Sequence, residues 1–139
     1  MWYNLFKLKV GQVMDIVNIA NQLSTIAVVK NVAKDEYEII TGANIAPKTP
    51  AKIYLINSGG QIKLTDKKST LKYMNNLYEL KAPDVKSCIS SVIKLYGFTI
   101  ASGELQANIV SEDSVKEIFY NFIICMGQLA NMYAFFDKP

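Results

Sequence analysis

Two short β-type runs separated by a pair of glycines constrain this chain more than any other feature. Residues 52–56 (KIYLI) and 61–65 (QIKLT) are rich in β-branched and aromatic side chains, and Asn57, Ser58, Gly59 and Gly60 connect them. Glycine adopts the positive φ angles that a tight hairpin turn needs. The sequence therefore predicts an antiparallel hairpin here, and any fold must include a sheet.

Other segments extend this sheet. Residues 25–32 and 36–41 predict two further antiparallel strands. Residues 98–100 and 105–109 flank a Ser-Gly pair and predict a second hairpin, whose residues 105, 107 and 109 face the core. Residues 42–50 include a glycine, an asparagine and two prolines, so we expect a loop there, the most flexible in the chain.

Apolar side chains at helical spacing predict four helices. The first covers about residues 10–22, and the second follows Asp66, a helix-capping residue, as far as the Ala-Pro break at 82–83. The third covers residues 84–96 and ends at a glycine. The last follows Ser114 and Glu117, which are spaced as a capping box.

This order of elements predicts an α+β fold, with a largely antiparallel sheet of two hairpin pairs and helices packed on one face. The chain has 139 residues, of which 50% are apolar and 19% charged. That is enough to build one core, so we expect residues 1–139 to form a single α+β domain.

The composition excludes many catalytic sites. All 15 basic residues are lysines, because the sequence contains neither arginine nor histidine. Without imidazole, the usual catalytic triads and most zinc and haem sites are unavailable. Without guanidinium groups, the chain cannot form bidentate contacts to phosphate or guanine. We therefore expect a binding protein rather than an enzyme, with no catalytic residues, no metal and no cofactor.

The sequence also carries hypotheses about location and redox state. The first ten residues do not continue into a signal peptide, and polar residues interrupt the longest apolar stretch, 118–136. We therefore expect a cytoplasmic protein without membrane contact. Cys88 and Cys125 both lie in apolar helical patterns, which favours buried, reduced thiols.

Positive charge is concentrated in the middle of the chain. Residues 48–94 contain nine lysines and three acids, whereas the rest contains six lysines and nine acids. Such a patch could bind a nucleic-acid backbone or an acidic protein surface, although lysines also simply solvate outer faces. The predicted partner-binding residues are Lys63, Lys67, Lys68, Lys72 and Tyr73.

A metal-dependent nuclease is the best enzymatic alternative. Asp66 and Lys68 form a D-x-K pair after a strand, and Glu36 or Glu38 could supply a second acid. Helix capping explains Asp66 without any chemistry, and the other acid groups fit turns and helix starts. This alternative therefore ranks below both binding hypotheses.

Aromatic residues gather at the two ends of the chain. Trp2, Tyr3 and Phe6 lie at the start, and Tyr133, Phe135 and Phe136 at the end. They favour a core edge or a protein interface over a stacked ligand. Together with the apolar last helix, they could form the face of a homodimer.

From residue 38 to residue 133 the chain resembles a family of bacterial and prophage domains known as the domain of unknown function eighteen-twenty-eight. The resemblance is one of pattern and short sequence words. They are Ile39-Ile40-Thr41, Ile53-Tyr54-Leu55, Ile62 to Asp66, Thr70 to Met74, Tyr96-Gly97, Gly103-Glu104-Leu105 and Gln128 to Met132.

The resemblance implies the fold and a mobile-element context, and it transfers no active-site residues. Where the family has a second acid and a glycine after the position of Asp66, this chain has Lys67 and Lys68. The charged loop before the family's central strand is here residues 46–51. The leading hypothesis is a phage- or mobile-element-encoded inhibitor that binds a host protein or ribonucleoprotein complex, for example an anti-CRISPR or other anti-defence protein.

Overall fold

In a computed structural model that describes residues 14–76 and 79–132, six antiparallel strands form one sheet in the order β1-β2-β3-β4-β6-β5. The strands are β1 Val28–Ala33, β2 Glu36–Ala46, β3 Thr49–Ser58, β4 Gln61–Thr65, β5 Thr99–Ala101 and β6 Glu104–Asn108. The helices are α1 Ile16–Leu23, α2 Ser69–Met74, α3 Pro83–Tyr96 and α4 Val115–Ala130, with a 3-10 turn at Glu112–Ser114.

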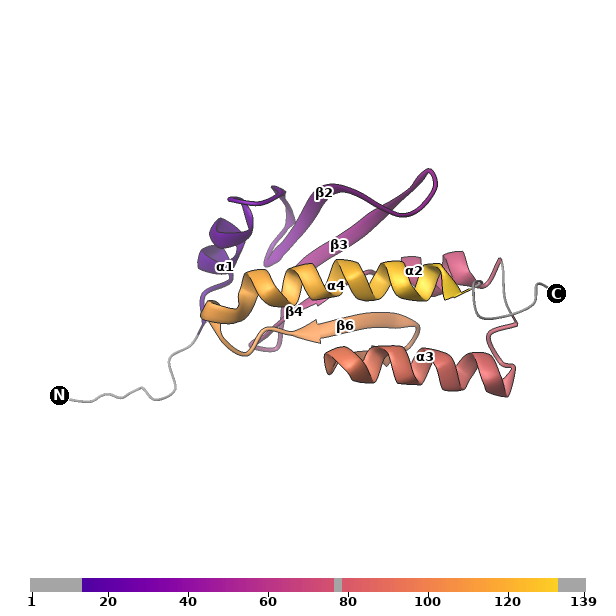
Figure 1. The fold of residues 1–139 in the computed structure, drawn as a ribbon. Helices are drawn as coiled ribbons and strands as arrows, with labels where there is room; N and C mark the ends of the chain where they lie inside the picture. Colours follow the sequence, from indigo (N-terminus) through magenta and orange to yellow (C-terminus); the bar gives the residue numbers. More distant parts are fainter. Residues whose placement is uncertain (1–13, 77–78, 133–139) are drawn as a thin grey trace.

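The helices form a layer on one face of this sheet. Helix α4 runs along the sheet, with α1 near its start, α2 near its end and α3 alongside it (Figure 1). Helix α4 packs on β2 and also contacts each of the other three helices. The predicted α+β fold with helices on one face is therefore confirmed.

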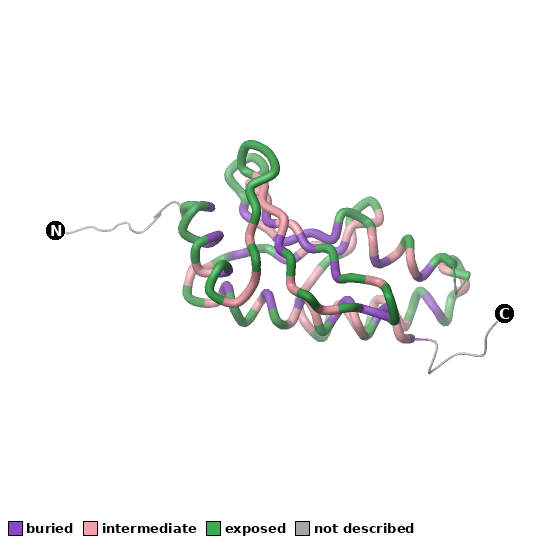
Figure 2. The backbone as a smooth tube through the Cα atoms, turned by 90° about the horizontal axis from the view of Figure 1, so that it is seen from above, coloured by how far each residue is buried: buried purple, intermediate pink, exposed green. Residues whose placement is uncertain are grey.

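Alternation of side chains along the strands creates the two unlike faces. Ile39, Ile53, Leu55, Leu64 and Leu105 are all buried beneath the helices. Their neighbours in sequence point to the other face and are exposed or half-buried, apart from the buried Thr65. Figure 2 shows exposed residues at the chain turns and along the outer sides of the helices. One face of the sheet thus builds the core, and no helix in residues 14–76 and 79–132 covers the other.

Both predicted hairpins are confirmed. The β3–β4 turn contains Gly59 and Gly60, with φ angles of 61° and 83°. The β5–β6 turn contains Ser102 and Gly103, with φ angles of 52° and 81°. These left-handed conformations suit two-residue turns whose twist matches that of the strands.

The prediction that residues 42–50 form a loop is wrong. Strand β2 continues to Ala46 and β3 begins at Thr49, so the two strands form a long hairpin. Gly42 has a φ of 76° and lies where the register between β2 and β3 shifts, which accommodates a bulge. The reversal is short, with Lys48 in the left-handed region at φ 60°. Glycine and proline here shape a strand pair rather than interrupt it.

Two of the predicted helices are shorter than expected. Helix α1 begins at Ile16, because the Asp15 carboxylate accepts a hydrogen bond from the backbone N–H of Val17 at 2.9 Å and caps the helix. Helix α2 ends at Met74, eight residues before the Ala-Pro break. The expected helical positions at residues 10, 13, 77 and 78 lie outside the described residues.

The last two helices have the expected limits but not all the expected contacts. The Ser114 hydroxyl donates to the carbonyl of Ser111 instead of capping α4, so the predicted capping box is not formed. Within α3, Val85 is buried and the rest of the apolar stripe is half-buried, because α3 packs mainly against α4 and the short edge strand β5. No helix in the described part of the chain is both long and apolar enough to span a bilayer.

A pair of glycine substitutions tests the turn geometry. Gly60→Ala should lower the free energy of unfolding by about 1 kcal/mol, because an L side chain is strained at positive φ. Gly127→Ala, in α4 where an added Cβ meets no atom within 4 Å, should instead raise it by about 0.5–1 kcal/mol. Urea unfolding measures both, and equal effects of the same sign would contradict this assignment.

Candidate functional site

A buried carboxylate organises the chain where β4 ends. Asp66 is 1% exposed. Its Oδ1 accepts hydrogen bonds from the backbone N–H of Lys68 at 2.9 Å and of Leu105 at 3.0 Å, and its Oδ2 accepts one from Thr70 at 3.0 Å. The N-cap position of α2 is Lys68 rather than Asp66, but the bond from Thr70 shows that Asp66 still satisfies an N–H of the first helical turn. In addition, the carboxylate joins β4, α2 and β6.

This carboxylate supports an unusual turn. Lys67 and Lys68 have φ angles of 49° and 73°, two consecutive left-handed residues that are not glycine. Each costs about 1 kcal/mol or more relative to the ordinary helical region. The bond from the Lys68 N–H to Asp66 and that from the Lys67 N–H to the Thr65 hydroxyl (3.0 Å) help to hold this conformation. Strained residues held in this way are often found at functional sites.

The turn places Lys67 over the uncovered side of the sheet. Its ammonium group forms an ion pair with Glu36 and lies 4.3 Å from the centroid of the Tyr54 ring. Beneath it, the Thr65 hydroxyl donates to Glu104 at 2.6 Å. We call this surface the open sheet face and define it by Glu36, Glu38, Tyr54, Ile56, Lys63, Thr65, Lys67, Glu104 and Gln106.

The structure divides the five predicted partner-binding residues among three places. Lys63 and Lys67 lie on the open sheet face, where the Lys63 ammonium is 3.4 Å from Gln106 Oε1. The side chain of Lys68 runs toward the β5–β6 turn. A Cβ atom added to Gly103 in that turn would lie 3.8 Å from the Cγ of Lys68. Lys72 and Tyr73 lie on α2 and line a separate cleft.

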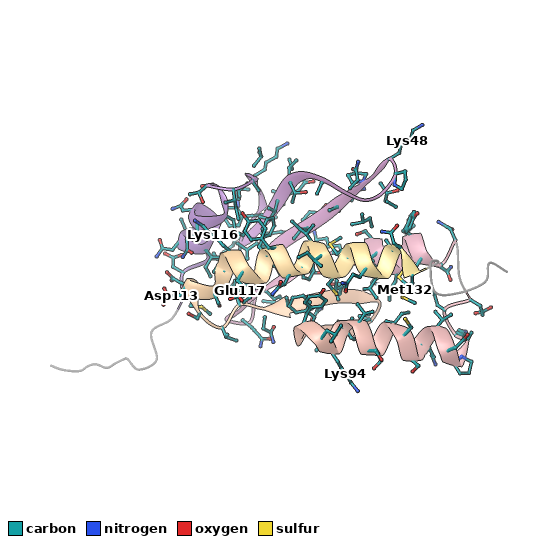
Figure 3. All side chains as sticks on the ribbon, in the orientation of Figure 1. Lys48, Lys94, Asp113, Lys116, Glu117 and Met132 are labelled. Carbon is teal, nitrogen blue, oxygen red and sulfur yellow. The ribbon has the colours of Figure 1, made fainter. Side chains whose placement is uncertain are left out.

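That cleft contains two lysines that sequence reasoning missed. Lys48 and Lys52 belong to the β2–β3 hairpin and line the cleft together with Lys72. Figure 3 shows Lys48 at the tip of the hairpin. Sequence reasoning missed them because it treated residues 42–50 as a loop. These residues instead extend the β2–β3 hairpin, which lies alongside α2. We call this second surface the lysine cleft.

A third, apolar surface lies between α3 and α4. It is a groove of about 560 Å³ whose lining includes Cys88, Val92, Leu95 and Ile124, with Met132 at one end (Figure 3). Leu95 is 77% exposed and Ile124 is 50% exposed. The expected homodimer contact by the last helix stays a prediction, and the terminal aromatic residues proposed for it lie outside the described residues.

The carboxylates of the nuclease hypothesis serve structural contacts. All three hydrogen bonds to Asp66 come from backbone N–H groups, and Glu36 is paired with Lys67. In residues 14–76 and 79–132, no three or more Cys, Asp or Glu side chains lie together as a possible metal site. Asp35 lies in the β1–β2 turn, whereas Glu36 and Glu38 belong to β2.

The two cysteines differ in environment. Both are free thiols; Cys125 is buried in α4, whereas Cys88 is half-buried. Burial, reinforced by the negative charge of Asp66, raises the pKa of Cys125 from 9.0 to about 12. Cys125 is therefore an unreactive core residue at neutral pH.

Removing the charge of Asp66 tests its structural role. Asp66→Asn should lower the free energy of unfolding by about 2–3 kcal/mol, because an amide N–H₂ would face a backbone donor. Asp84→Asn is the matched control, since Asp84 is exposed and its side chain accepts, among the described residues, only from the N–H of Val85. Urea unfolding measures both. Unchanged stability of Asp66→Asn, or the loss of a Mg²⁺-dependent nuclease activity in the folded variant, would contradict a purely structural role.

The pKa of Cys125 predicts a pH dependence of stability. In the unfolded chain this thiol loses its proton near 9.0, whereas the native state keeps it until about 12. The unfolded state then binds fewer protons, so the free energy of unfolding should fall as the pH rises through 9 toward 12. Urea unfolding between pH 7.5 and 10 should show a steeper fall for the wild type than for Cys125→Ala. Equal slopes would show that Cys125 does not titrate in this way.

Comparison of the chain with models of known protein families, with curated proteins and with solved structures finds no match.

Proposed function

We propose that this protein is a small non-enzymatic binding protein that acts by protein–protein contact through its open sheet face. The observation that carries the proposal is the ordered turn that fixes Lys67 between Glu36 and Tyr54. A pre-ordered charged and aromatic group loses little conformational entropy when a partner binds. Tyrosine is enriched at interface centres, so Tyr54 is the anchor of this surface, and the charged residues around it would form the polar rim.

The charge pattern favours a protein over a nucleic acid at this face. Glu36, Glu38 and Glu104 lie among its lysines, and these acids would repel a phosphate backbone. A protein surface can present both signs of charge and complement such a mosaic. A standard interface takes about 800 Å² from each partner, so the contact would extend beyond Lys67 across several strands.

We further propose that the partner is a host protein or ribonucleoprotein complex, such as a CRISPR or restriction component, and that binding inhibits it. The phage or mobile-element origin rests on the resemblance to prophage domains. Cytoplasmic location belongs to the same proposal. Electrostatic nucleic-acid binding is the second candidate, and the lysine cleft is the observation that favours it.

A charge reversal at Lys67 on the open sheet face, combined with its neighbour Lys68 beside the β5–β6 turn, tests the proposal. The double variant Lys67→Glu/Lys68→Glu should reduce recovery of the partner in affinity pull-downs from host lysate by about tenfold or more, because Glu36 would then face a like charge. The matched control is Lys94→Glu on α3, away from this face (Figure 3). Mass spectrometry identifies the partner, with and without nuclease treatment of the lysate.

The outcomes separate the candidates. A complex that survives nuclease, is lost with the double variant and is kept with Lys94→Glu supports protein–protein contact at this face. Recovery that the double variant leaves unchanged contradicts it. Recovery of nucleic acid alone, removed by salt, replaces it with the second candidate.

A further inference from the structure

The lysine cleft is a concave surface between the tip of the β2–β3 hairpin and α2. Its volume is about 330 Å³, at the lower end of the range for small-molecule sites. It is separate from the α3–α4 groove and from the contact made by Lys67. Its lining residues are Ile45, Lys48, Thr49, Pro50, Lys52, Ser69, Lys72, Tyr73 and Asn76.

The charge of this cleft is of one sign. Among the described residues, Lys48, Lys52 and Lys72 line it and no acid does. In the part of the chain that the structure describes, none of the three forms an ion pair, whereas Lys67 on the open sheet face is paired with Glu36. These like charges give the cleft a positive potential, and a bound anion would lower their mutual repulsion.

A hydroxyl group adds a donor to the same cleft. Ser69 lines it, and its Oγ is buried without a hydrogen-bond partner among the described residues. A buried hydroxyl without a partner is costly, so such a group in a native protein calls for an explanation. A bound oxyanion would accept this hydrogen bond and compensate that cost.

We propose that the lysine cleft binds phosphate groups, as carried by a nucleotide or by a nucleic-acid strand. Lysine binds phosphate as a point charge and needs no bidentate geometry, which suits a chain without arginine. The volume accommodates one phosphate with its sugar. Tyr73 in the lining offers an aromatic face beside it. This proposal is independent of the protein contact above, because the two sites share no residue.

The test compares two double variants of the full chain. Lys52→Gln/Lys72→Gln removes two charges from the cleft, and Lys63→Gln/Lys67→Gln removes two from the open sheet face. All four lysines are exposed or half-buried, and circular dichroism checks that the variants fold. Calorimetry with pyrophosphate and fluorescence anisotropy with a labelled twelve-residue oligothymidine measure binding at two salt concentrations.

The cleft variant should bind both probes about tenfold more weakly than the wild type does. For the oligonucleotide, the slope of log binding constant against log salt concentration should fall by about 2 in magnitude. The face variant should change neither the affinity nor this slope by much. Ser69→Ala should also weaken binding without changing the salt slope. If the cleft variant weakens pyrophosphate binding, the natural ligand is a free phosphate compound. If it weakens binding of the oligonucleotide alone, the natural ligand is a nucleic-acid strand. Equal losses in both double variants, equal binding of a poly-glutamate peptide, or no binding of either probe would overturn the proposal.

Discussion

The fold around both candidate binding surfaces depends on one buried negative charge. The Asp66 carboxylate accepts three backbone hydrogen bonds, from the turn after β4, from the start of α2 and from β6. An ionised acceptor makes these bonds roughly twice as strong as neutral ones. The first holds Lys68 in the left-handed region, and the turn that results carries Lys67 onto the open sheet face. The second fixes α2, which forms one wall of the lysine cleft. One side chain thus positions two surfaces that face different directions.

The two surfaces differ in how their lysines are compensated. On the open sheet face, Glu36 neutralises Lys67 and the Tyr54 ring lies beside the lysine. In the cleft, Lys48, Lys52 and Lys72 have no acid among them. Net charge alone could not distinguish these cases, because both sets fall in the same basic stretch of sequence. Pairing across strands decides which lysines remain available to an external anion.

Local patterns predicted the elements, but distant contacts set their limits. The glycine turn at residues 59–60 predicted its hairpin because the requirement for positive φ lies within the turn itself. The proline-containing segment before Lys52 was misread as a loop, because pairing with β2 and the bulge at Gly42 depend on the partner strand. The sequence predicted that Asp66 caps a helix, yet its bond to Leu105 joins residues 39 positions apart. Likewise, the lysines of the basic stretch divide between the open sheet face and the lysine cleft according to where the fold places each side chain. Composition does not reveal that placement.

The sheet order has a consequence for the route by which the chain folds. Strands β1 to β4 form a meander in which every pairing is between sequence neighbours, so each hairpin can form quickly on its own. By contrast, β4 and β6 pair only after the segment containing α2 and α3 has closed into a loop. Closing that loop costs chain entropy before its contacts compensate. We therefore expect the meander to appear early in refolding and the docking of β6 beside Asp66 to limit the rate.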